Sequence, residues 1–77
     1  MTEKLNAYRA YCEREFRDFT RAIENGWDDI TNARNCGLQR CLGVADFLQI
    51  VEDVPFDDIN KIYEEYRTKF YEIKKGK

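Results

Sequence analysis

The chain has 77 residues, of which 43% are hydrophobic, and its 13 basic and 15 acidic residues give a net charge of −2. This length allows one domain, residues 1–77, with a thin core that requires dense apolar packing. This near-neutral net charge argues against a dedicated nucleic-acid-binding protein, because such proteins are usually basic. No apolar run approaches the roughly 20 residues of a membrane span, so we expect no membrane partner.

The sequence contains no histidine, which removes the commonest general base and the commonest metal ligand. Three cysteines and no signal-peptide pattern indicate a cytoplasmic protein with reduced thiols. We therefore expect no enzyme activity, no metal and no cofactor.

Apolar residues of the first segment repeat every three or four positions, which is the helical period. They are Leu5, Tyr8, Cys12, Phe16, Phe19 and Ile23. The spacing predicts a helix over about 3–24, ended by Asn25-Gly26, because both residues tolerate the left-handed conformation that ends helices.

A second helix is predicted over about 28–52, with Asp28 or Asp29 capping its start. Its apolar face is broad, as in a helix that contacts two neighbours. Ala33, Gly37 and Cys41 line the middle of this face with small side chains. We expect these positions to admit bulky rings from the flanking helices. The candidate rings are Phe16, Phe19, Tyr66 and Phe70.

Pro55 separates the second helix from a third, predicted over about 56–74, with Asp57 and Asp58 in its first turn and Lys74 in its last. Its inward positions are Ile59, Ile62, Tyr63, Tyr66, Phe70 and Ile73. Two short links between long helices imply antiparallel neighbours. The expected fold is therefore all-α, an up-down-up three-helix bundle with an aromatic-rich core.

Arg14, Arg17 and Arg21 are spaced to share one face of the first helix and form the best candidate surface for an acidic protein partner. The alternative, which we favour, is a solvated face that is self-paired through Glu13–Arg17 and Arg14–Asp18.

Trp27 is expected to cover the end of the bundle, with an exposed anchor for a partner as the alternative. Tyr71 and Ile50 fall outside the apolar stripes, and exposed groups of this kind can seed a dimer, so the chain is expected to be a monomer or a homodimer.

The cysteines and the acidic pairs are interpreted as structural. Cys36 and Cys41 lie five residues apart, so their side chains point about 140° apart around a helix. They therefore cannot coordinate one metal ion together. We expect the three thiols to be core residues. Three of the four adjacent acidic pairs lie near predicted helix ends, where caps and helix dipoles explain them: Asp28-Asp29, Glu52-Asp53 and Asp57-Asp58. The fourth pair, Glu64-Glu65, points its two carboxylates apart.

The stretch Leu38-Gln39-Arg40-Cys41-Leu42-Gly43-Val44-Ala45-Asp46-Phe47-Leu48 resembles the helix-turn-helix of bacterial repressors, with its turn at Gly43. The resemblance implies DNA binding. However, the reading helix would carry two acids and no Arg or Lys, so its charge would repel phosphate. We favour a continuous central helix.

Three short segments are similar in style to small uncharacterised all-α proteins of bacterial phages and integrative mobile elements. They are Asn32-Ala33-Arg34-Asn35, Arg40-Cys41-Leu42-Gly43-Val44 and Val54-Pro55-Phe56-Asp57-Asp58-Ile59. The resemblance implies an accessory protein that binds another macromolecule. Our hypothesis is a non-catalytic protein–protein interaction module, such as an adaptor or inhibitor. The alternatives are a helix-turn-helix DNA-binding protein and a self-associating structural protein.

Overall fold

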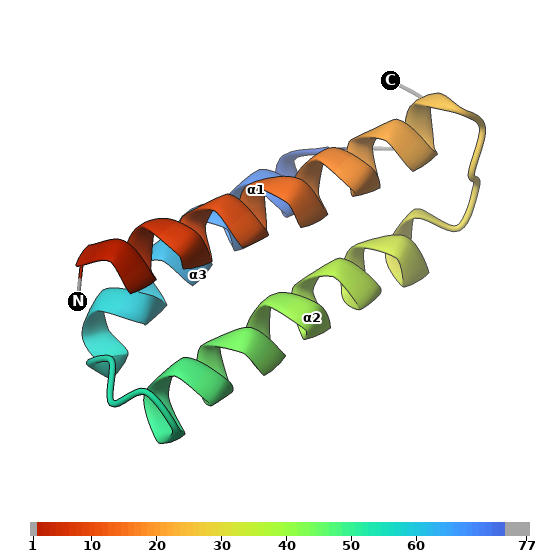
Figure 1. Cartoon of the computed structure of the whole chain (residues 1–77). Coiled ribbons are helices and arrows are strands. Elements are labelled where there is room, and N and C mark those ends of the chain that lie inside the picture. Colours follow the sequence, from red (N-terminus) through yellow and green to blue (C-terminus); the bar gives the residue numbers. More distant parts are fainter. Residues whose placement is uncertain (1, 74–77) are drawn as a thin grey trace.

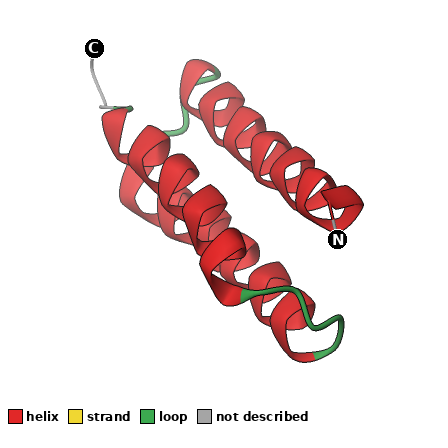
Figure 2. Ribbon diagram, turned by 90° about the vertical axis from the view of Figure 1, so that its left-hand side faces the viewer, coloured by secondary structure: helices red, strands yellow, loops and turns green. Residues whose placement is uncertain are grey.

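The computed structural model describes residues 2–73, which form three antiparallel helices (Figure 1). Helix α1 spans Thr2–Glu24, α2 spans Ile30–Ile50 and α3 spans Phe56–Glu72. Each helix packs against the other two, which confirms the expected all-α, up-down-up bundle. The molecule measures 40 × 16 × 16 Å, and its two links lie at opposite ends (Figure 2).

The link between α1 and α2 follows the predicted chemistry. Gly26 adopts a positive φ of 100°, and the Asn25 N–H donates to the Arg21 carbonyl at 3.0 Å. Asp29 is the N-cap of α2, because its side chain accepts from the Asn32 N–H at 3.1 Å. The helix therefore begins at Ile30, two residues later than predicted.

The link between α2 and α3 is tightly folded. Residue 52 was predicted to be helical, but α2 ends at Ile50, and Asp53 takes a positive φ of 58°. This turn lets the Val54 N–H donate to the Leu48 carbonyl at 3.0 Å and leaves Val54 only 1% exposed. Helix α3 begins at Phe56 as predicted. It ends at Glu72, and Ile73, which was predicted to be helical, is extended. The predicted last residue, Lys74, lies outside the described residues.

Aromatic rings fill the centre of the bundle, as the sequence predicts. The Phe70 ring is fully buried, with its centroid 5.3 Å from that of Phe16 and 4.9 Å from that of Phe19. It lies against Gly37, where an added Cβ would be 2.8 Å from the ring. This contact confirms that a small residue of the central helix admits a bulky ring from α3.

Candidate functional site

The structure places Arg14, Arg17 and Arg21, hereafter the arginine face, on one exposed side of α1. Of the two predicted ion pairs, Glu13–Arg17 is confirmed and Arg14–Asp18 is not formed. Arg17 lies 3.9 Å from Glu13, and the Arg14 guanidinium lies 5.4 Å from the Tyr11 ring centroid instead of pairing with Asp18. Arg21 makes no ion pair with another residue of the 2–73 range. Solvent-exposed pairs of this kind contribute only about 0–1 kcal/mol to stability.

Trp27 does not cover the end of the bundle, which was the role we favoured. Its side chain is 53% exposed. The indole N–H donates to the Asp29 carbonyl at 3.2 Å, which holds the ring over the link between α1 and α2. About half of Trp27 is accessible to solvent, so the alternative interpretation, an exposed anchor for a partner, stays a prediction.

Trp27 also lines an open pocket of about 310 Å³ between α1 and α2, hereafter the α1–α2 pocket. The pocket is lined by Glu15, Asp18, Phe19, Ala22, Trp27, Asn32, Ala33, Cys36, Gly37 and Arg40. Asp18 and Ala22 directly follow Arg17 and Arg21 in the sequence, and successive helix residues point about 100° apart. The arginine face and the α1–α2 pocket are therefore adjacent on α1.

A buried carboxylate at this pocket, paired with an exposed arginine, was not predicted from the sequence. Glu15 is only 6% exposed, and its carboxylate accepts from Arg40 of α2 at 3.2 Å. The pair compensates a carboxylate that would otherwise be costly to bury. The signal was present, because Glu15 lies in helical register with Cys12 and Phe19, on the inward face of α1.

Two of the three thiols are core residues, as predicted, and the third is not. Cys12 and Cys41 are fully buried, whereas Cys36 is exposed and lines the α1–α2 pocket. The Tyr8 hydroxyl donates to the Cys41 carbonyl at 3.0 Å, which ties α1 to α2. The pKa of the Cys41 thiol is raised by its hydrogen bond to Cys12 and by burial. Burial also raises the pKa of the Tyr8 phenol.

The acidic pairs mostly have the structural roles expected of them. Asp29 caps α2, while Asp57 and Asp58 occupy the first turn of α3. Glu65 binds Arg9 of α1 at 2.7 Å in an exposed pair. Within residues 2–73, no three carboxylates or thiols converge in a way that could hold a metal ion.

The helix-turn-helix interpretation lacks its turn, because Gly43 lies inside the continuous helix α2.

Ile50 and Tyr71 are 75% and 44% exposed, as their positions off the apolar stripes predict. The ring of Tyr71 is covered by the Arg34 guanidinium, 4.4 Å from its centroid.

Comparison with known proteins leaves the function to be argued from these residues. No protein-family model, curated protein or solved structure matches the chain. Within residues 2–73, no helix combines the length and the apolar character needed to cross a bilayer.

Proposed function

We propose that this protein is a non-catalytic protein–protein interaction module whose partner binds the α1–α2 pocket and the adjoining arginine face. The observation that carries the proposal is Trp27, a large ring left 53% exposed beside an open pocket. Tryptophan and arginine are the residue types most enriched at the energetic centres of protein interfaces. Here both types lie on adjoining surfaces of one small molecule.

The chemistry of the two surfaces defines the partner. The arginine face supplies three exposed guanidinium groups, which favour a carboxylate-rich surface. The pocket beside it has apolar walls from Phe19, Ala22 and Ala33, which suit an apolar side chain. The partner we propose is therefore an acidic protein segment with at least one apolar anchor. In keeping with the resemblance to phage and mobile-element proteins, the chain would act as a cytoplasmic adaptor or inhibitor.

DNA binding is the less favoured alternative. Besides the missing turn at Gly43, residues 41–60 contain five acidic and no basic residues, so the C-terminal half of α2 and the link after it would repel phosphate.

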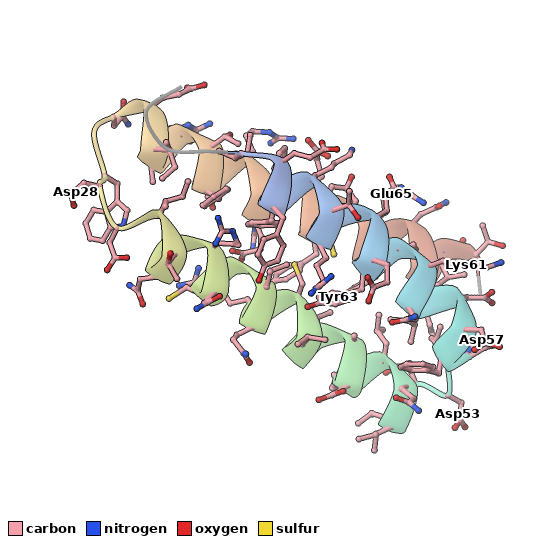
Figure 3. All side chains as sticks on the ribbon, turned by 180° about the vertical axis from the view of Figure 1, so that it is seen from behind. Asp28, Asp53, Asp57, Lys61, Tyr63 and Glu65 are labelled. Atoms are coloured by element: carbon pink, nitrogen blue, oxygen red, sulfur yellow. The ribbon has the colours of Figure 1, made fainter. Side chains whose placement is uncertain are left out.

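Affinity capture from cells that produce the chain, followed by mass spectrometry, tests the proposal. The tagged wild type should enrich a partner that Trp27→Ala and the triple variant Arg14→Glu/Arg17→Glu/Arg21→Glu both lose. Helicity and melting should stay close to wild type in the triple variant, because exposed ion pairs contribute only about 0–1 kcal/mol. Lys61→Glu on α3 is the control, because it reverses an exposed positive charge near Asp57, at the end of the bundle away from Asp28, and it should keep the partner (Figure 3). A partner captured equally well by the folded triple variant would show that the arginine face is not its binding surface.

A further inference from the structure

A second surface lies at the other end of the bundle, where α2 is linked to α3. Four apolar residues are exposed here: Phe47 (52%) and Ile50 (75%) at the end of α2, Val51 (61%) directly after it and Phe56 (54%) at the start of α3. We call these four residues the end patch. The two phenylalanines are each about half exposed. Apolar surface concentrated in this way is typical of interaction sites.

Acidic residues are interspersed with the end patch in the sequence. Residues 41–60 contain five acidic residues and no basic residue. They are Asp46, Glu52, Asp53, Asp57 and Asp58. Figure 3 shows Asp53 and Asp57 at this end of the bundle and Asp28 at the other. Lys4 of α1 neutralises Glu52 at 2.7 Å, but the other four carboxylates have no ion pair with any residue in the 2–73 range.

The backbone beneath the patch is fixed. The Val51 N–H donates to the Phe47 carbonyl at 2.8 Å, and the Glu52 N–H donates to the Leu48 carbonyl at 3.2 Å. The Leu48 carbonyl also accepts from the N–H of Val54, and the side chain of Val54 is buried. A partner would therefore meet a preformed surface, which reduces the ordering cost of binding.

We propose that the end patch docks a basic amphipathic segment of another protein. Its apolar side chains would cover the end patch, and its Lys or Arg side chains would meet the surrounding carboxylates. A second copy of this chain is a poorer occupant, because a two-fold contact through the end patch would bring two sets of like charges together. The proposal is independent of the function proposed above, since the end patch and Trp27 lie at opposite ends of the bundle.

Fluorescence anisotropy with a short labelled amphipathic helical peptide of leucine and lysine tests the proposal. The wild type should bind this peptide and should bind a matched leucine–glutamate peptide at least about tenfold more weakly. Added salt should weaken the lysine complex, because exposed charges are screened. Ile50→Ser/Val51→Ser should lower the affinity about tenfold without unfolding the chain, because both side chains are largely exposed.

Trp27→Ala is the control and should bind the peptide as tightly as the wild type does. Loss of partner capture by Trp27→Ala with intact peptide binding would separate this proposal from the proposed function. The proposal would be overturned if the folded Ile50→Ser/Val51→Ser variant bound the lysine peptide as tightly as the wild type. It would also be overturned by sedimentation of the wild type as a dimer that the same variant abolishes, because the occupant would then be a second copy.

Discussion

Gly37 offers a direct test of how the core is packed. A Cβ at this position would lie 2.8 Å from Cε1 and 3.0 Å from Cζ of Phe70. The ring cannot easily move away, because Phe16 and Phe19 hold it on the other sides and it is fully buried. Gly37→Ala should therefore force a rearrangement of the aromatic core.

Gly43 provides the matched control on the same helix. No atom lies within 4 Å of a Cβ added there. Alanine is about 1 kcal/mol more favourable than glycine inside a helix, and this gain applies at both positions. Overpacking a core costs about 1–3 kcal/mol, and this cost applies only at Gly37. Gly43→Ala should thus be more stable than the wild type by about 1 kcal/mol. Gly37→Ala should be about 1–3 kcal/mol less stable than Gly43→Ala.

Urea unfolding followed by far-ultraviolet circular dichroism measures this difference, because the free energy of unfolding falls linearly with denaturant. A difference of 1 kcal/mol corresponds to about 4–8 °C in Tm for a domain of this size, so thermal melts provide a second readout. If both alanine variants stabilised the protein equally, Phe70 would not be held against Gly37 and the packing argument would be wrong.

Three further predictions concern a cap, a thiol and a phenol. Asp29→Ala should destabilise the protein by about 1 kcal/mol in urea unfolding, because it removes the α2 cap, whereas Asp29→Asn should cost less. Cys36 alone should react quickly with a thiol reagent in the native protein, and fast reaction of all three thiols would contradict the burial of the other two. Burial and its hydrogen bond to Glu13 raise the pKa of Tyr66 to about 12. Because an unfolded phenol has a pKa of about 10, the stability from Tyr66 is complete below that pH and is lost as the pH rises toward 12. Alkaline titration of the free energy of unfolding should show a smaller loss over this range in Tyr66→Phe than in the wild type.

The fold was predictable because its signals are local. Helical apolar spacing, the Asn25-Gly26 stop and Pro55 placed three helices in order. The errors in helix ends have local causes as well. Asp29 caps α2, as one of the two predicted cap residues, so the helix begins only at Ile30. The positive φ of Asp53 turns the chain after α2, although residues 51 and 52 still make helix-like hydrogen bonds.

The candidate site was less predictable, because it depends on contacts between helices and on the path of a link. The inward register of Glu15 is visible in the sequence, but its partner Arg40 lies 25 residues away on another helix. The exposure of Trp27 depends on a hydrogen bond to Asp29 that no periodic pattern encodes. The position of the arginine face was predictable, and its proximity to an open pocket was not.

An odd number of antiparallel helices has a consequence for valency. The first link lies at one end of a molecule 40 Å long and the second link lies at the other. A partner bound at Trp27 would therefore leave the end patch sterically accessible, and a partner bound at the end patch would leave Trp27 accessible. With both ends occupied, the bundle would act as a rigid spacer that fixes the separation of two different partners.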